Sequence, residues 1–138
     1  MKKLLFLFLV QTIFLLGCND NKIEKPTTAW DTGREFIRSS LDGDFKRAEK
    51  FLLQDEANKQ FFESYKSYYN RLPIEDKRKY KSASYEINKL LELNDSTVII
   101  NYSNSYMHTP MEIKVIKDNN NNWAVDFTYI SSGNLPIN

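Results

Sequence analysis

The spacing of hydrophobic and polar residues along this chain changes near residue 80. Between residues 28 and 80, apolar residues recur every three or four positions, which predicts helices with one buried face. Beyond residue 80 apolar and polar residues alternate, which predicts strands with one buried face. Helices followed by a meander of strands predict an α+β domain, with helices packed on one face of a curved antiparallel sheet of about four strands. The other face of that sheet can meet solvent or a partner.

A first helix is expected over residues 28–41. Thr28 can cap its N-terminus, and Asp31 follows three residues later in a capping-box-like position. Gly43 is expected to end the helix, because glycine accepts the left-handed conformation found there. The apolar face of this helix comprises Ala29, Trp30, Gly33, Phe36, Ile37 and Leu41.

Three further helical segments are expected before the spacing changes. Asp44 can cap a short second helix that reaches Leu53. Its inward residues are Phe45, Ala48, Phe51 and Leu52. A third helix is expected over residues 55–71, and Pro73 separates it from a brief fourth segment over residues 74–80. The apolar side of the third helix carries Ala57, Phe61, Phe62, Tyr65, Tyr68, Tyr69 and Leu72.

Four strands are expected after residue 80, separated by turns at residues 94–96, 108–110 and 118–122 that are rich in Asn, Asp or Pro. The first strand places Tyr85, Ile87, Leu91 and Leu93 on one face. The second strand, over residues 97–106, does the same with Val98, Ile100, Tyr102 and Tyr106. The third and fourth strands present Met111, Ile113 and Val115, and then Trp123, Val125, Phe127 and Tyr129.

The N-terminus has a pattern of its own. Lys2 and Lys3 precede an apolar run of about 13 residues, short for a membrane span of roughly 20, and the run ends at Leu15-Leu16-Gly17-Cys18. This pattern resembles the signal peptide and lipobox of a bacterial lipoprotein. The resemblance implies cleavage before Cys18, a diacylglycerol on its sulfur and an acylated amino group. An uncleaved signal anchor and an ordinary secretory signal with a chance cysteine are the alternatives.

These patterns divide the chain into a signal peptide at residues 1–17, a polar tether at 18–27, a domain at 28–130 and a tail at 131–138. The lipoprotein resemblance implies a place in the bacterial cell envelope, on the periplasmic or cell-surface face, with the membrane as partner through the lipid on Cys18. Cys18 is the single cysteine. Its lipidation therefore leaves no disulfide, thiol nucleophile or thiolate metal ligand in the mature chain.

The charge of the chain is nearly balanced, with 19 basic and 18 acidic residues and a net charge of +1. No strong field of either sign favours nucleic acid or an anionic surface. The basic cluster at residues 77–81 follows Glu75 and Asp76, which favours a solvated helix face. We therefore expect no nucleic-acid partner. The high aromatic content, 14%, suits either a pocket or an ordinary core.

Residues that carry chemistry are few. His108 is the single histidine and lies in an expected loop beside Thr109 and Pro110. We interpret it as an ordinary loop residue, with a role as general base as the alternative. A chain with one histidine and no free cysteine is not expected to hold a transition metal. The sequence contains no phosphate-binding loop and no nucleophile elbow, so we expect no cofactor and no acyl intermediate.

Two segments carry a resemblance in fold. The stretch from Trp30 to Ala48, centred on Leu41-Asp42-Gly43-Asp44-Phe45, is similar to the opening of NTF2-like domains, where a first helix ends in a Gly-Asp turn. Asn122-Trp123-Ala124-Val125-Asp126 resembles their last strands. More narrowly, residues 28–130 resemble the small NTF2-like lipoproteins described as DUF4878 or lumazine-binding-like. The resemblance implies a cone, with helices closing over a strongly bent sheet around a cavity. A cystatin-like single helix on a sheet is the structural alternative.

The resemblance also suggests site residues. Some NTF2-like enzymes place a carboxylate on a strand facing the cavity, which makes Asp126 a weak catalytic candidate beside His108. If its neighbours Val125 and Phe127 point inward, Asp126 points to the opposite face, so a structural or solvated role is favoured. The aromatic residues that can line a ligand pocket are Trp30, Tyr65, Tyr68, Tyr69, Tyr102 and Tyr106, with ordinary core packing as the alternative.

Three functions remain open, because a fold of this kind hosts several. The favoured one is a lipid-anchored, non-catalytic envelope lipoprotein that binds a partner protein or a small apolar ligand. The second is a small cavity enzyme of the NTF2-like type, in the isomerase, dehydratase or hydrolase class. The third is a dimerisation or scaffold module that uses the open sheet face, and hence a homodimer.

Overall fold

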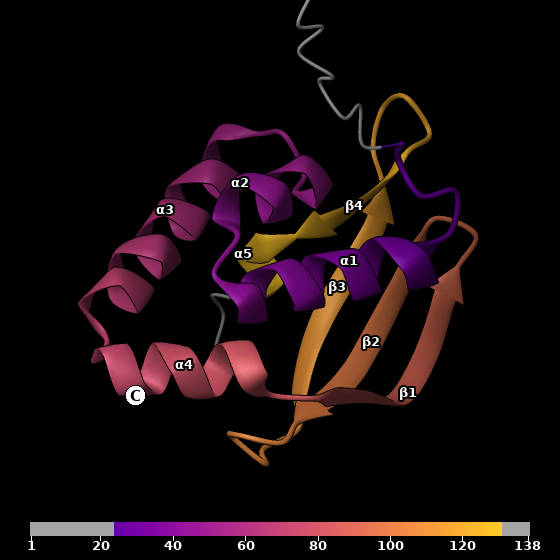
Figure 1. Ribbon diagram of the computed structural model, residues 1–138. Helices are drawn as coiled ribbons and strands as arrows, with labels where there is room; N and C mark the ends of the chain where they lie inside the picture. The colour runs from indigo at the N-terminus through magenta and orange to yellow at the C-terminus, as the bar shows by residue number, and fades with distance from the viewer. Residues whose placement is uncertain (1–23, 131–138) are drawn as a thin grey trace, which may run out of the picture.

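In the computed structural model, described over residues 24–130, helices cover one face of a four-stranded antiparallel sheet that does not close into a barrel (Figure 1). The elements in chain order are α1 (Ala29–Asp42), α2 (Phe45–Ala48), the 3₁₀ helix η1 (Glu49–Phe51), α3 (Glu56–Arg71), α4 (Ile74–Ser82), β1 (Tyr85–Asn94), β2 (Thr97–Asn104), β3 (Met111–Lys117), β4 (Trp123–Asp126) and α5 (Phe127–Tyr129). The predicted α+β architecture is confirmed. The predicted signal peptide with Cys18, most of the tether and the tail lie outside the described residues.

Both ends of α1 form as the sequence predicts. The Thr28 hydroxyl oxygen accepts the backbone N–H of Asp31 at 3.0 Å and donates to the Asp31 carboxylate at 2.7 Å. At the other end Gly43 has a φ of 71°, in the left-handed region, and its N–H donates to the carbonyl of Ser40 at 3.1 Å. The predicted boundaries of this helix are correct to within one residue.

The face of α1 that lies on the sheet differs from the prediction at one position. Ala29 and Phe36 are buried, whereas Trp30 is 39% exposed and has the Arg34 guanidinium 5.9 Å from its ring centroid. Angle around the helix does not explain the exposure, because Trp30 lies on the same side of α1 as Ile37, seven residues later, which is buried; Trp30 differs in lying in the first turn of the helix. The prediction that Trp30 lies on the buried face of this helix is therefore wrong.

The segment after α1 covers the edge of β4. The Asp44 carboxylate caps α2 by accepting the N–H of Arg47 at 3.1 Å, and the four residues predicted to face inward here are all buried. Leu52 forms a parallel bridge with Val125, and the N–H of Leu53 donates to the Val125 carbonyl at 2.9 Å. This contact gives the short edge strand a partner on its free side.

On α3 the prediction fails at Ala57 and Phe61, which are both exposed, while the polar residue Asn58 is buried. The Asn58 amide nitrogen donates to the Asp55 carboxylate at 3.0 and 2.9 Å. Its amide oxygen accepts the backbone N–H of Phe127. Because all its polar atoms have partners, Asn58 can be buried, and it ties α3 to the start of α5.

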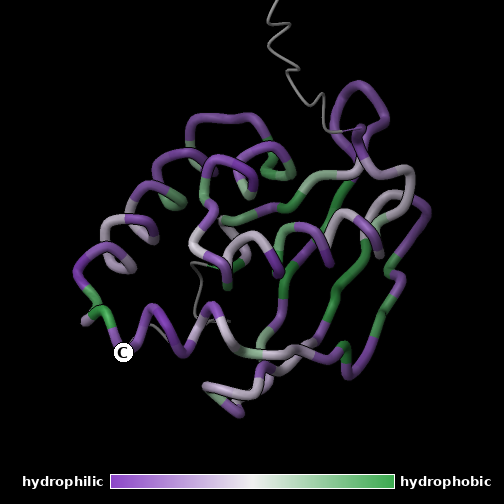
Figure 2. The backbone as a smooth tube through the Cα atoms, viewed as in Figure 1, coloured by the Kyte–Doolittle hydropathy of each residue, from purple (hydrophilic) through white to green (hydrophobic). Residues whose placement is uncertain are grey.

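The sheet has the order β1-β2-β3-β4, and its two central strands are its most hydrophobic part (Figure 2). In β1 a register shift lies between Ile87 and Lys89, which pair with consecutive residues of β2. This bulge reverses the side-chain alternation beyond it, so Leu90 packs against the core while Leu91 and Leu93 are exposed. The predicted inward positions of Leu91 and Leu93 are therefore wrong. The inward residues predicted for β3 are all buried, as expected.

The predicted fourth strand is too long. β4 ends at Asp126, and Phe127 and Tyr129 lie in the short helix α5. The cause is a capping interaction, since the Asp126 carboxylate accepts the backbone N–H of Thr128 at 3.1 Å. Phe127 consequently turns into the space between α3 and the sheet, where its ring meets Phe62 edge to face at 5.2 Å.

Candidate functional site

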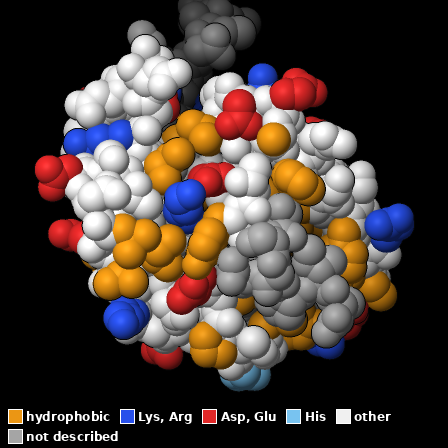
Figure 3. All heavy atoms as spheres, turned by 180° about the vertical axis from the view of Figure 1, so that it is seen from behind, with side chains coloured by type: hydrophobic (Ala, Val, Ile, Leu, Met, Phe, Trp, Pro, Cys, Tyr) orange, Lys and Arg blue, Asp and Glu red, His pale blue; other side chains and the backbone are white. Residues whose placement is uncertain are grey.

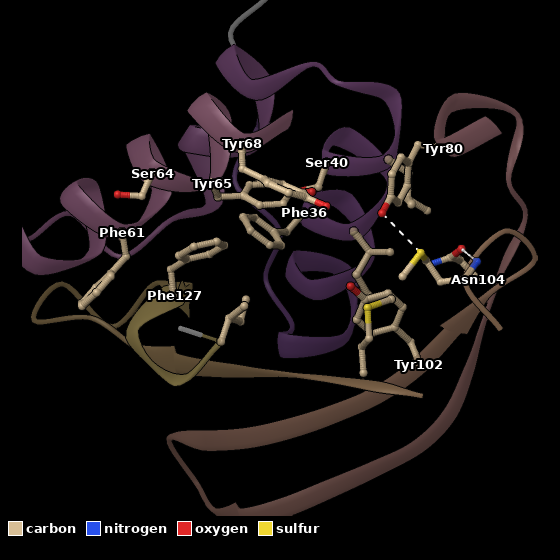
Figure 4. Close-up of a pocket in the computed structure, with 15 residues that line it drawn as sticks. Phe36, Ser40, Phe61, Ser64, Tyr65, Tyr68, Tyr80, Tyr102, Asn104 and Phe127 are labelled. Atoms are coloured by element: carbon tan, nitrogen blue, oxygen red, sulfur yellow. Dashed lines mark hydrogen bonds between the residues drawn. The ribbon is translucent and has the colours of Figure 1, made fainter. Parts of the chain in front are cut away.

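An apolar cavity of about 170 Å³ lies between α1, α3 and the sheet (Figure 4). Aromatic rings supply much of its wall, namely those of Phe36, Phe61, Tyr65, Tyr68, Tyr80, Tyr102 and Phe127. Aliphatic and sulfur-containing side chains from α1, β3 and the loop after β2 complete it. The polar groups in the wall are Ser40, Ser64, Asn104 and the tyrosine hydroxyls. The cavity therefore presents an apolar interior with a few hydrogen-bonding groups, the composition typical of small-molecule sites.

The structure brings three of the six predicted pocket residues together. Tyr65, Tyr68 and Tyr102 line the cavity, whereas Trp30, Tyr69 and Tyr106 are absent from its wall. Two of the three residues that do not line the cavity pack against one of its wall residues. The rings of Tyr69 and Tyr106 both contact the ring of Tyr80, with centroids 6.1 and 4.8 Å away.

Tyr106 lies beyond the end of β2, in the turn that follows it, so the predicted strand is two residues too long. The cause is Asn104, whose side-chain oxygen accepts the backbone N–H groups of Tyr106 at 3.1 Å and Met107 at 2.8 Å. These hydrogen bonds form a turn where the strand would otherwise continue its pairing with the neighbouring strands. The Tyr106 hydroxyl then donates to the Asp76 carboxylate at 3.1 Å, on α4.

The sequence pointed to three of the fifteen wall residues as pocket candidates, and Tyr80 and Phe127 are two of those it missed. Tyr80 lies in the last turn of α4 and closes the end of the cavity near Tyr102 and Asn104 (Figure 4). Its signal was available, because it is the one aromatic residue in an otherwise charged segment. Phe127 carried no usable signal, because its position depends on the turn from β4 into α5.

Tyr65, Tyr80 and Tyr102 of the wall are neutral at physiological pH. Burial, followed by the influence of neighbouring tyrosines, raises the pKa of Tyr65 and of Tyr102 above the ordinary phenol value. Burial likewise raises the pKa of Tyr80 to about 12. The Tyr80 hydroxyl donates to the Met107 sulfur at 3.3 Å, which holds the loop after β2 against α4. These phenols can donate and accept hydrogen bonds without bringing charge into the cavity.

The two weak catalytic candidates lie outside the cavity. His108 is exposed in the loop between β2 and β3 with a φ of 56°, and its pale blue side chain is visible at the surface in Figure 3. Asp126 is buried, but its carboxylate pairs with the Lys114 ammonium at 3.0 Å and with the hydroxyl and backbone N–H of Thr128. Neither residue lines the cavity wall.

The environment of Asp126 lowers its pKa. Burial alone would raise it, and the hydrogen bonds from Thr128 and Lys114 together outweigh burial. The carboxylate is therefore ionised at neutral pH, with its oxygens engaged in capping α5 and in the ion pair. A general base needs an available oxygen at the substrate, which this arrangement does not provide.

Three further findings bear on function. Within residues 24–130, no three His, Cys, Asp or Glu side chains come together in a way that suits a metal ion. Over the same residues, no helix has both the length and the apolar character that crossing a membrane requires. Comparisons with protein-family models, with curated proteins and with solved structures found no match.

Proposed function

We propose that this protein is a non-catalytic, lipid-anchored lipoprotein of the bacterial cell envelope whose domain binds a small apolar ligand. The observation that supports ligand binding is the aromatic cavity of about 170 Å³. Drug-sized ligands occupy pockets of roughly 300–1,000 Å³, whereas an engineered apolar cavity of about 150 Å³ binds benzene. The cavity therefore suits a ligand of about one ring or a short aliphatic chain.

The proposal includes an NTF2-like cone as the fold. Its support is the cover of helices on one face of an antiparallel sheet, with a cavity between the two layers. The turn at Gly43 and Asp44, where α1 ends and α2 begins, also supports this fold. Lipid attachment at Cys18 rests on the sequence of the leader alone.

Binding is favoured over catalysis because of what the cavity wall contains. Among the described residues, the side chains that line it include no carboxylate and no histidine. No carboxylate or histidine in the wall can therefore take a proton from its serine or tyrosine hydroxyls, and a phenol whose pKa is raised stays protonated at neutral pH and cannot serve as the base. An NTF2-like enzyme would need an acid or base at this position, so we do not propose one.

Binding in the cavity is also favoured over assembly through the sheet. The outer face of the sheet exposes Leu91 beside a polar network, in which Asn88 donates to Asn101 at 2.9 Å and Asn101 donates to Glu112 at 3.3 Å. The hydroxyl of Tyr129 donates to Glu112 at 2.7 Å on the same face. A stable homodimer usually buries a more apolar surface than this.

The experiment is a binding titration of the full-length chain with toluene, followed by thermal unfolding. Toluene at ten times its dissociation constant should stabilise the protein by about 1.4 kcal/mol, which raises Tm by several degrees. Ser40→Leu places a larger apolar side chain in the wall and should abolish this rise. Ser67→Leu makes the same change on an exposed face of α3 and should retain it.

Absence of any toluene effect in the unmodified chain would rule out the proposed binding. So would a Ser40→Leu variant that responds as strongly as the control, because the ligand would then occupy another place. The unfolding curve of Ser40→Leu without ligand shows that the variant is folded.

A further inference from the structure

We infer that the natural ligand is an uncharged amphiphile, an apolar body carrying one oxygen that accepts a hydrogen bond from the Asn104 side-chain amide. The inference rests on the proposed function and specifies the chemistry of the ligand. It follows from the polar atoms that the cavity wall leaves without partners, and from the absence of charge in that wall.

The orientation of the Asn104 amide is set by the backbone around it. Its oxygen accepts the N–H groups of Tyr106 and Met107 at 3.1 and 2.8 Å, so the other end of the amide must be the NH₂ group. Asn104 is 3% exposed, and its Nδ2 has no hydrogen-bond partner within the described part of the chain. Asn104 lines the cavity beside Tyr80 and Tyr102 (Figure 4), and its Nδ2 is fully buried at that part of the wall.

An unpartnered donor at this depth is unusual. Leaving a buried donor unsatisfied costs about 1–3 kcal/mol, and a ligand that accepts a hydrogen bond recovers that free energy on binding. The Nδ2 group cannot turn away from the cavity without breaking both bonds of its oxygen to the backbone. It is therefore a donor held in place before the ligand arrives, which reduces the entropic cost of binding.

A second polar atom of the same wall is also unpartnered. On α1, the hydroxyls of Thr32 and Ser39 donate to the carbonyls four residues earlier, at 2.9 and 2.6 Å. The hydroxyl of Ser40 is buried, lines the cavity and makes no hydrogen bond among the described residues. Ser40 and Asn104 come from α1 and from the end of β2, so two buried polar atoms without partners among the described residues belong to residues that line the same cavity.

The charge of the ligand follows from the rest of the wall. Among the residues that line the cavity there is no Lys, Arg or His to pair with a carboxylate, and no Asp or Glu to pair with an amine. An ionised ligand would lose its hydration without gaining a counter-ion, which is strongly unfavourable. A ketone, aldehyde, ester or alcohol of about one ring meets both conditions, since it is neutral and offers an acceptor oxygen.

The test compares cyclohexanone with methylcyclohexane on the full-length chain at pH 8, by NMR titration. The variant is Asn104→Asp, which retains an oxygen for the two backbone N–H groups and replaces the NH₂ donor with a second oxygen. Loss of one hydrogen bond should lower the ratio of ketone to hydrocarbon affinity at least fivefold. Asn120→Asp makes the same chemical change in the exposed turn between β3 and β4 and should leave the ratio unchanged.

A second measurement needs no variant and therefore stands if Asn104→Asp fails to fold. The side-chain NH₂ resonances of Asn104 in the unmodified protein should shift on addition of cyclohexanone to a different extent and direction than on addition of methylcyclohexane. Cyclohexanecarboxylate, the charged probe, should bind at least tenfold more weakly than cyclohexanone.

The outcomes separate the two claims. If neither neutral probe binds, the proposed function is wrong and this inference falls with it. If both bind but the Asn104 resonances respond alike and Asn104→Asp leaves the ratio unchanged, ligand binding stands and the inference is overturned. Tight binding of the carboxylate would also overturn it.

Discussion

At the residue scale, the approach of α1 to the sheet depends on the absence of a side chain at Gly33. A Cβ atom at this position would lie 2.3 Å from Cδ1 of Ile100, closer than carbon atoms approach in proteins. Ile100 is completely buried on β2, so its side chain has little room to move away. Glycine has a low helix propensity, yet the absence of a side chain at Gly33 is what allows α1 to pack closely on the sheet.

Gly33→Ala should therefore destabilise the protein by about 1–3 kcal/mol, the usual cost of overpacking a core, although alanine is the better helix former. Ile100→Val removes the Cδ1 atom and should cost about 0.5–1.5 kcal/mol on its own. Urea unfolding of the two single variants and the double variant measures the coupling between them. The double variant should be more stable than the sum of the single effects predicts, and strict additivity would contradict the proposed clash.

At the scale of secondary-structure elements, short polar side chains decide where helices begin and strands end. Thr28, Asp44 and Asp55 accept backbone N–H groups at the starts of α1, α2 and α3. Asp126 does the same for α5, and thereby directs Phe127 into the cavity wall. The shape of the site thus depends on a capping residue that does not itself line the cavity.

Asp126→Ala should destabilise the protein by about 1–2 kcal/mol at pH 7, because it removes the cap of α5 and the partner of Lys114. Asp126→Asn retains a capping oxygen and should cost less. The folded protein lowers the pKa of Asp126, so the carboxylate contributes stability above its unfolded pKa of about 3.9 and loses that contribution as the pH falls through the folded value. Urea unfolding should show that the difference in free energy of unfolding between the unmodified protein and Asp126→Ala is smaller at pH 3 than at pH 7. A difference that is larger at pH 3 would contradict the assignment.

At the scale of the whole molecule, a domain with a small apolar cavity follows an N-terminal segment whose sequence resembles a lipoprotein leader. Acyl chains contribute about 0.8 kcal/mol per buried methylene, so two or three of them make anchoring effectively permanent. On the proposed lipoprotein role, the ligand site would be held within reach of the membrane. Small neutral amphiphiles partition into membranes, which makes such a position useful for binding them.

Cys18→Ser tests the anchor. The variant should appear in the soluble fraction or accumulate as an unprocessed precursor, because serine offers no sulfur for the diacylglycerol. Membrane fractionation and mass spectrometry of the N-terminus measure both outcomes. A processed Cys18→Ser protein that stays in the membrane fraction would contradict lipid anchoring, and the toluene titration of the cavity serves as the control for folding.

Much of the fold could be predicted because its signals are local. Thr28 and Gly43 mark the ends of α1 through bonds to residues within four positions. Ile100 and Ile113 lie in strands whose alternation is read directly from the sequence. Of the predicted pocket residues, Tyr65, Tyr68 and Tyr102 share the cavity for the same reason, since each lies on the inward side of a regular element.

The sequence by itself determined the order of the helices and strands as far as β4, the caps at Thr28, Gly43 and Asp44 and most of the buried faces, because these depend on spacing and on contacts within one turn. The tertiary structure alone decided the bulge that exposes Leu91, the burial of Asn58 beside Phe127 and the buried amide nitrogen of Asn104 that has no partner among the described residues. Each of these depends on partners brought together from distant parts of the chain or on a space between layers. A cavity is a property of packing among elements, and no periodicity within one element encodes it.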